Sequence, residues 1–221
     1  MSNVYSFERN INNEDELIHN LNSTEYNILE IYIDNKSIDI YKEIKINNNI
    51  QKLLIIGSSK DSSILRFNNS ISNGLIFNSF IQKITFKNIT IYGHLEFHNV
   101  NNVLFEDTIL NGSIISNDKS SKNELIQMNN FIYNAFIDFK TTCISLYGNV
   151  KIDNSYFYGN SLCTDNILSY DGENINNIDI SNSYFNGIYT NTCIGINNAN
   201  ESNITSSIFE NGSAYNDGGY L

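Results

Sequence analysis

A short pattern of alternating residues around a polar corner recurs six times along the chain, and it constrains the fold more than any other feature. In "NNIDISNSYFNG" (176–187), apolar and polar residues alternate on both sides of Asn182. Alternation with a period of two is typical of a β-strand with one buried face, so the pattern predicts two short strands joined by a sharp bend. Segments that superpose on it without gaps are 84–93, 103–112, 126–135, 150–159, 178–187 and 202–211.

The six copies are separated by about 19 to 28 residues, a loose period near two dozen. Helical repeats would show a period of 3.6, and an antiparallel meander would need tight Asn-Gly turns between its strands. We therefore expect an all-β fold, a right-handed parallel β-helix of about eight coils. Equivalent strands of successive coils would then stack about 4.8 Å apart.

Stacking of the copies predicts three columns of side chains. The first column facing the core contains Phe86, Phe105, Met128, Ile152, Ile180 and Ile204. The second contains Ile91, Leu110, Tyr133, Phe157, Phe185 and Phe209. The polar corner column contains Asn88, Asp107, Asn130, Asn154, Asn182 and Ser206. Asn tolerates the left-handed backbone of a sharp bend, and stacked amides can bond from coil to coil, so an Asn ladder is expected, weakest at Asp107 and Ser206.

The chain is expected to form one domain with a capped N-terminal end. The expected parts are a disordered start (1–11) and a single β-helix domain (12–221), the latter divided into a capping helix (12–22), first coils (28–67) and repeated coils (74–221).

The capping helix is indicated by Asn13 three residues before Glu16, with Leu17 and Leu21 on one apolar face. Such a helix would cover the open end of a stack of coils. The other end, "NDGGYL", shows no helix and no charged edge strand. We therefore expect the chain to be a fragment that continues into further coils, or to meet a partner at its C-terminal edge through Tyr220 and Leu221.

Charge and hydropathy exclude some partners. The chain carries 24 acidic and 13 basic residues, a formal charge of −11, which repels nucleic acid. No stretch approaches the roughly 18 apolar residues of a membrane-spanning helix, and no signal peptide is visible in the first twenty residues. These features are compatible with a protein outside the cell and with a protein in the cytoplasm.

Three cysteines, Cys143, Cys163 and Cys193, show no metal-binding spacing. Aligning 143–148 with 193–198 places Cys143 and Cys193 in one column, two coils apart with Asn166 between them, which is too far for a bond. Cys163 could pair with either one. Three reduced, partly buried thiols are the expected state.

The histidines and acidic turns give no metal site. His94 and His98 would point to the same side of a strand, about 13 Å apart, too far to hold one ion. Asp165 and the acidic run 171–174 offer hard oxygen atoms to calcium, but two carboxylates in a turn are usually only solvated. The sequence therefore predicts no metal site and no cofactor.

The whole chain nevertheless resembles a known group of enzymes in its order of capping helix, first strands and "LLIIG" (53–57). This order is similar to that of the right-handed parallel β-helix superfamily typified by pectate lyases. The last coil, "FENGSAYNDGG" (209–219), also resembles the repeat of polymorphic outer-membrane proteins and adhesin-like β-helices, with one residue between Phe209 and Asn211 instead of two. A fold-level resemblance does not transfer an activity.

The resemblance implies where catalytic residues would lie. Pectin-degrading members use a calcium-binding Asp group with a basic proton abstractor, commonly Arg, or three Asp residues with a Gly-His-Gly segment. Here Arg9 and Arg66 have no Asp cluster beside them in sequence, and Lys140 and Lys151 stand alone. No Gly-His-Gly segment occurs. No catalytic residue is therefore predicted.

Two hypotheses of function follow. The first is a non-catalytic β-helix segment of a larger extracellular or cell-surface protein, serving as a structural spacer or as a platform that binds glycans or proteins. Its outward tyrosines, Tyr156, Tyr158, Tyr184 and Tyr189, would be available to stack on sugars. The alternative is a polysaccharide lyase or glycoside hydrolase that acts on pectic substrates, in which Arg66 is the residue to test.

Overall fold

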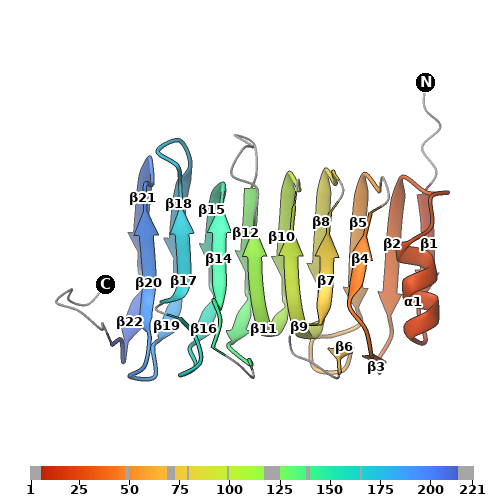
Figure 1. Cartoon of the computed structure of the whole chain (residues 1–221), viewed down its shortest axis with the longest axis horizontal. Coiled ribbons are helices and arrows are strands. Elements are labelled where there is room, and N and C mark those ends of the chain that lie inside the picture. Colours follow the sequence, from red (N-terminus) through yellow and green to blue (C-terminus); the bar gives the residue numbers. More distant parts are fainter. Residues whose placement is uncertain are drawn as a thin grey trace.

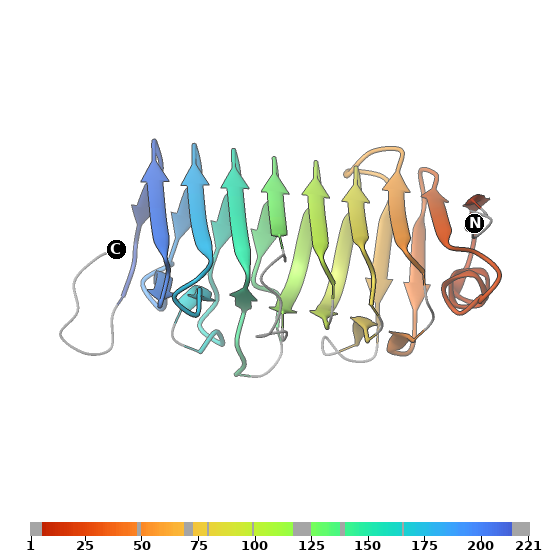
Figure 2. The same cartoon turned by 90° about the horizontal axis from the view of Figure 1, so that it is seen from above.

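The chain folds into a rod of stacked β-coils (Figure 1), a parallel β-solenoid of about eight turns. The computed structural model describes residues 6–47, 50–68, 73–78, 80–98, 100–116, 125–137, 140–164 and 166–213. Among these residues all paired strands are parallel. Figure 2 shows the strands of successive coils side by side along the rod. The predicted architecture is confirmed.

Two sheets run along the rod. Within the described residues, the nine-stranded sheet contains β1 (Ser6–Asn10), β2 (Ile28–Ile33), β5 (Lys52–Gly57), β8 (Lys83–Lys87), β10 (Asn102–Glu106), β12 (Leu125–Asn129), β15 (Asn149–Asp153), β18 (Asn177–Ser181) and β21 (Glu201–Thr205). The thirteen-stranded sheet of the same residues contains β3 (Ser37–Ile40), β4 (Ile44–Ile46), β6 (Ile64–Phe67), β7 (Gly74–Phe77), β9 (Thr90–Phe97), β11 (Ile109–Ser116), β13 (Ile132–Asn134), β14 (Ile144–Tyr147), β16 (Tyr156–Tyr158), β17 (Asn166–Asp171), β19 (Tyr184–Asn186), β20 (Thr192–Asn197) and β22 (Ile208–Glu210).

Both predicted core columns are present in the predicted register. In the first, Phe105 lies between Phe86 and Met128, and the column continues strand by strand to Ile204. In the second, Tyr133 follows Leu110, and the column ends at Phe209. The members before the last coil are buried. Alternation fixed this register because a slip of one residue would turn every apolar side chain outward.

The corner column is held mainly by the backbone. All six corner residues have a positive φ, between 48° and 52°, as expected for a sharp bend. The N–H groups of the first five donate to the carbonyl group that precedes the corner of the next coil, for example from Asn88 to Glu106 at 3.1 Å and from Asn154 to Ser181 at 3.2 Å. Main-chain atoms therefore form a ladder of contacts at the corners, where a ladder of side-chain amides was expected.

The side chains at the corners form the expected ladder only in part. The amide of Asn130 donates to the carboxylate of Asp107, so the expected weakness at Asp107 is wrong. A carboxylate lacks a donor but accepts well from the amide above it. Asn182 donates to Asp153 Oδ1 at 2.9 Å instead of to the corner Asn154.

A ladder of hydroxyl groups lies just inside the corner. Residues that follow the corner in successive coils are Thr108, Phe131, Ser155, Ser183 and Ser207. The N–H of Phe131 donates to Ser155 Oγ, that of Ser155 to Ser183 Oγ, and that of Ser183 to Ser207 Oγ, each at 3.1 Å. The hydroxyl of Ser155 in turn donates to the Asp153 carbonyl oxygen at 2.7 Å. The sequence analysis did not predict this ladder.

The N-terminal end is capped by α1 (Glu14–Leu21), within the predicted span 12–22 (Figure 1). Asn13 Oδ1 accepts the N–H of Glu16 at 2.9 Å, which is the expected capping contact. Leu17 and Leu21 are fully buried against the end of the core. The helix therefore supplies the apolar surface that a further coil would otherwise provide.

The start of the chain differs from the expected disorder through residue 11. Residues 6–10 form β1, which pairs in parallel with β2 from Ser6 opposite Ile28 to Asn10 opposite Tyr32. The ring of Phe7 stacks on Tyr26, with ring centroids 4.1 Å apart. Main-chain pairing and this aromatic contact order a segment whose polar composition suggested disorder. Residues 1–5 lie outside the described part.

The last described coil contains β20, β21 and β22. Ile204, in β21, is 37% exposed, whereas its register partner Ile180 is buried. The segment after residue 213, with Tyr220 and Leu221, lies outside the described residues, so the expected continuation or partner at this edge stays a prediction. Within the described ranges no helix has the length and apolar character needed to cross a membrane.

Candidate functional site

Three outward tyrosines gather on two neighbouring coils of the thirteen-stranded sheet. Tyr156 and Tyr158 flank the buried Phe157 in β16, and Tyr184 precedes the buried Phe185 in β19. The ring centroid of Tyr184 lies 6.1 Å from that of Tyr156 and 5.9 Å from that of Tyr158. Tyr156 is 43% exposed. The three rings form an aromatic surface, which we call the tyrosine cluster.

Polar groups fix the edge of the tyrosine cluster. The hydroxyl of Tyr184 donates to Glu210 Oε1, and Asn186 Nδ2 donates to the same hydroxyl at 2.9 Å. The bond to the Glu210 carboxylate raises the pKa of Tyr184, because ionising the phenol would remove the donor. The site therefore presents apolar ring faces beside neutral phenols, an amide and a carboxylate.

Tyr189, the fourth tyrosine of the prediction, lies in the turn after β19 and is 75% exposed. It follows Ile188, and both residues have a positive φ, 47° and 61°. The aromatic contacts found among the described residues join the other three tyrosines and leave Tyr189 out. Only three of the four tyrosines are therefore shown to lie together.

Arg66 lies in β6, far from the tyrosine cluster along the rod. Its register neighbours are Asp39 in β3 and Tyr92 in β9, and its Cζ atom lies 5.1 Å from the centre of the Tyr92 ring. A lyase of the pectate type needs several carboxylates around a calcium ion as well as the base. The described part of the chain contains no group of three His, Cys, Asp or Glu side chains placed to hold a metal ion.

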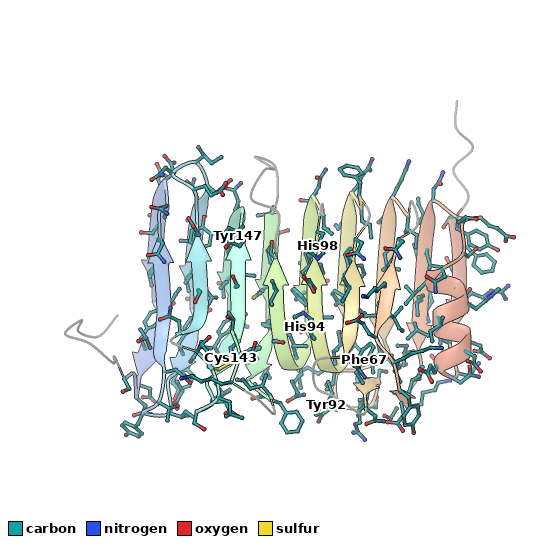
Figure 3. All side chains as sticks on the ribbon, in the orientation of Figure 1. Phe67, Tyr92, His94, His98, Cys143 and Tyr147 are labelled. Atoms are coloured by element: carbon teal, nitrogen blue, oxygen red, sulfur yellow. A yellow bond between two sulfur atoms is a disulfide. The ribbon has the colours of Figure 1, made fainter. Side chains whose placement is uncertain are left out.

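Both histidines, labelled in Figure 3, contact Glu96, a residue of β9 that lies between them in the sequence. His98 Nε2 lies 2.9 Å from Glu96 Oε1, and His94 Nε2 lies 3.5 Å from Glu96 Oε2. His94 Nδ1 and Ser113 Oγ of β11 are 2.8 Å apart. Burial lowers the pKa of His94 because it disfavours the charged ring, although Glu96 acts in the opposite direction.

The order hydroxyl, imidazole, carboxylate resembles the arrangement that activates a nucleophile. However, the Ser113 side chain belongs to a residue only 6% exposed, so its hydroxyl cannot contact a substrate in this conformation. We therefore assign the chain of contacts through Ser113, His94 and Glu96 to the stability of the sheet surface. Sequence reasoning missed Ser113 because its partner is one coil away.

The acidic turn 171–174 is stabilised by the chain itself. Asp171 Oδ1 accepts the N–H of Glu173 and the amide of Asn198, each at 3.1 Å. Asp165, the other carboxylate considered for calcium, lies outside the described residues. Asp171 thus holds the turn together and joins it to Asn198 in the next coil.

The cysteine prediction requires two corrections. Cys143 and Cys163 form a disulfide bond, so the expected set of three reduced thiols is wrong. The residue between Cys143 and Cys193 in their column is Ile167 and not Asn166. The disulfide bond is possible because the main chains of Thr141 and Cys163 pair in parallel, and this pairing brings the two neighbouring coils together at that point. Cys193 is free and buried, and burial raises the pKa of its thiol.

A hollow of about 810 Å³ lies at the capped end of the rod, between β1, α1 and residues 22–26. Its lining includes Arg9, Phe7, His19, Glu25 and Tyr26. The Arg9 Cζ atom and the Tyr26 ring centroid both lie 4.1 Å from the centre of the Phe7 ring, so they cover its two faces. This second candidate site depends on β1, which the sequence analysis did not predict.

The fold defines the class of protein as a parallel β-solenoid, with an aromatic surface near one end and a hollow at the other. Comparisons of the chain with models of protein families, with curated proteins and with solved structures gave no significant match.

Proposed function

We propose that the chain is a non-catalytic β-helix segment of a larger extracellular or cell-surface protein, and that it serves as a spacer and binds glycans. The observation that carries the proposal is the tyrosine cluster. Its rings lie on a rigid sheet, so little conformational entropy is lost when a ligand binds. Aromatic faces pack against the apolar faces of sugars, while phenol, amide and carboxylate groups bond to hydroxyls.

The disulfide bond between Cys143 and Cys163 supports an extracellular location. Disulfides persist in oxidising environments and are rare in the reducing cytosol. The bond joins segments of neighbouring coils, so it would stabilise a rod that is exposed outside the cell. Reduction of the disulfide bond under cytosolic conditions would remove this stabilisation of the rod.

Charge favours an uncharged glycan over a pectic one. The formal charge is −11, and the tyrosine cluster has the carboxylate of Glu210 at its edge. A polyuronate would meet repulsion from both. We do not advance the alternative of a pectic lyase or hydrolase, because the described residues place no calcium-binding carboxylate group beside Arg66. The resemblance to pectate lyases and adhesin repeats is kept as a hypothesis about ancestry.

Retention on glycans tests the proposal. The purified chain is run through gels that contain insoluble or soluble neutral polysaccharides, and its retardation is measured. Tyr184→Ala should abolish retardation, whereas Tyr26→Ala, at the hollow of the capped end, should leave it unchanged. Loss of binding in the Tyr26 variant alone would place the site at the hollow. A chain that binds no polysaccharide on such gels or on a glycan array would refute the proposal.

A further inference from the structure

Tyr158 of the tyrosine cluster belongs to a longer row of side chains on the outer face of the thirteen-stranded sheet. Because equivalent residues stack in register, Tyr158 is preceded by Asn134 and followed by Asn186. We call this row the axial row. It consists of the aligned residues Arg66, Tyr92, Asn111, Asn134, Tyr158, Asn186 and Glu210. Each member is an aromatic, amide or charged side chain, and the six steps of about 4.8 Å give a length of about 29 Å.

A second column runs beside the axial row, two residues earlier in each strand, and it is apolar or aromatic. Its members from β11 to β22 are Ile109, Ile132, Tyr156, Tyr184 and Ile208. The strip therefore has one apolar side and one polar side along its length. A linear polysaccharide has the same division, with apolar ring faces and hydroxyl-bearing edges.

Asn111, the third member of the axial row, has a hydrogen-bond donor without a partner among the described residues. Its Oδ1 accepts from Asn134 Nδ2 at 2.9 Å, but its own Nδ2 is buried and has no partner. The next member of the row is Tyr92, whose ring offers no amide acceptor at this place. Leaving a buried donor unpaired costs about 1–3 kcal/mol, so a ligand oxygen here would remove a penalty that the free protein carries.

The contact between Phe136 and Tyr92 spans the coil that contains Asn111. The Phe136 ring packs edge-on against Tyr92, with centroids 6.3 Å apart and an angle of 89°. Phe136 comes two residues after Asn134 of β13, and Tyr92 lies in β9. Strand β11, which contains Asn111, lies between these two strands, so the ring contact passes over it. The Phe136 side chain is 54% exposed and is not part of the buried core cluster.

We infer that the axial row binds a linear, uncharged polysaccharide that lies along the rod and passes over several coils. The inference rests on the proposed glycan binding and specifies the ligand class and its direction. The charges of Arg66 and Glu210 oppose one another at the two ends of the row, so the strip has no preference for a polyanion. Each sugar added along the rod reaches the side chains of the next coil.

Calorimetric titration with uncharged linear oligosaccharides of graded length tests this inference. Cello-, xylo- and N-acetylated chito-oligosaccharides of two to eight sugars are the probes. Affinity should rise with every added sugar until the ligand matches the length of the row. Asn111→Leu should lower affinity for the longest ligands by about tenfold, the loss of one good hydrogen bond, and should still melt cooperatively, which shows that the variant is folded. Tyr32→Ala, on the other sheet, is the control for an aromatic surface residue.

The outcomes separate the inference from the proposed function. If affinity stops rising at two or three sugars, or if Asn111→Leu binds the longest ligands as the natural chain does, the glycan does not follow the row and the inference fails. Binding to the tyrosine cluster would survive that result, because Tyr184→Ala would still abolish it. If the natural chain binds none of the oligosaccharides, both the inference and the proposed function are wrong.

Discussion

The hydroxyl ladder makes a sharp prediction about Ser155. The Ser155 side chain is fully buried and accepts the N–H of Phe131. Its hydroxyl lies within donating distance of the carbonyl oxygens of Asp153, at 2.7 Å, and Met128, at 3.3 Å. Ser155→Ala removes these contacts and takes only one non-hydrogen atom out of the core. Phe131 is itself fully buried, so water cannot replace the lost acceptor.

The expected cost follows from the group that is left unpaired. A buried N–H without an acceptor costs about 1–3 kcal/mol, and loss of the donated bond to Asp153 adds about 1 kcal/mol. Ser155→Ala should therefore lower the free energy of unfolding by about 2–4 kcal/mol. Ser207→Ala removes the equivalent acceptor, at 3.1 Å from the N–H of Ser183, in the last described coil. Ser207 is only partly buried, so water can take its place and the loss should stay below about 1 kcal/mol.

Urea denaturation followed by circular dichroism measures both variants against the natural chain. Ser155→Thr is a further control, since Thr108 occupies the same column in an earlier coil and donates to the Glu106 carbonyl oxygen at 3.0 Å. It should retain most of the stability that Ser155→Ala loses. Equal effects of Ser155→Ala and Ser207→Ala would show that the buried hydroxyl contacts do not stabilise the coil.

Three other changes test the core, the surface histidine and the disulfide bond. Ile180→Asp should abolish cooperative melting because it buries an unpaired charge, whereas Ile204→Asp, in the same column but 37% exposed, should have a small effect. Because the pKa of His94 is lowered on folding, the unfolded chain binds a proton more readily, so stability should fall as the pH drops below about 6.5. A urea series from pH 5 to 8 should show this slope, and His94→Gln should flatten it. Cys143→Ser should lower the free energy of unfolding by about 3 kcal/mol, given the 20-residue separation from Cys163, and a reducing agent should have no further effect on the variant.

The core and the corners could be predicted from sequence because a few rules determine them. Inward positions such as Phe105 and Phe157 alternate with polar residues, and this alternation fixes both the buried face and the register. The corner residues are recognisable because Asn is tolerated in the left-handed conformation that Asn88 and Asn182 adopt. Both signals lie within a segment of ten residues.

Features that depend on neighbouring coils could not be predicted in this way. The hydroxyl ladder was missed because its column also contains Phe131, so the column has no uniform residue type. The pairing of Cys143 with Cys163 depends on how the intervening loop returns to the sheet. The axial row was not predicted because only tyrosines were considered among the outward residues. Amides such as Asn111, which occupy equivalent positions in other coils, were not included.

The turns after two strands share a conformation that sequence could have indicated. In "DGENIN" (171–176) and "NGIYTN" (186–191), the first side chain accepts the N–H two residues later, and the two residues after Gly have a positive φ. A Cβ atom on Gly187 would lie 2.3 Å from the Asn191 carbonyl oxygen, so glycine is required there. The spacing Asp or Asn, Gly, three residues and Asn is therefore a usable signature of this turn.

The backbone bonds at the corners affect how such a chain can change over generations. Because the N–H of each corner residue from Asn88 to Asn182 meets a main-chain carbonyl group of the next coil, these contacts need a positive φ and hardly depend on the side chain, and both Asn and Asp occupy the position. A duplicated or deleted coil would find the same main-chain partners above and below it. Rods of this kind can therefore lengthen or shorten by whole coils while their outward residues diversify freely.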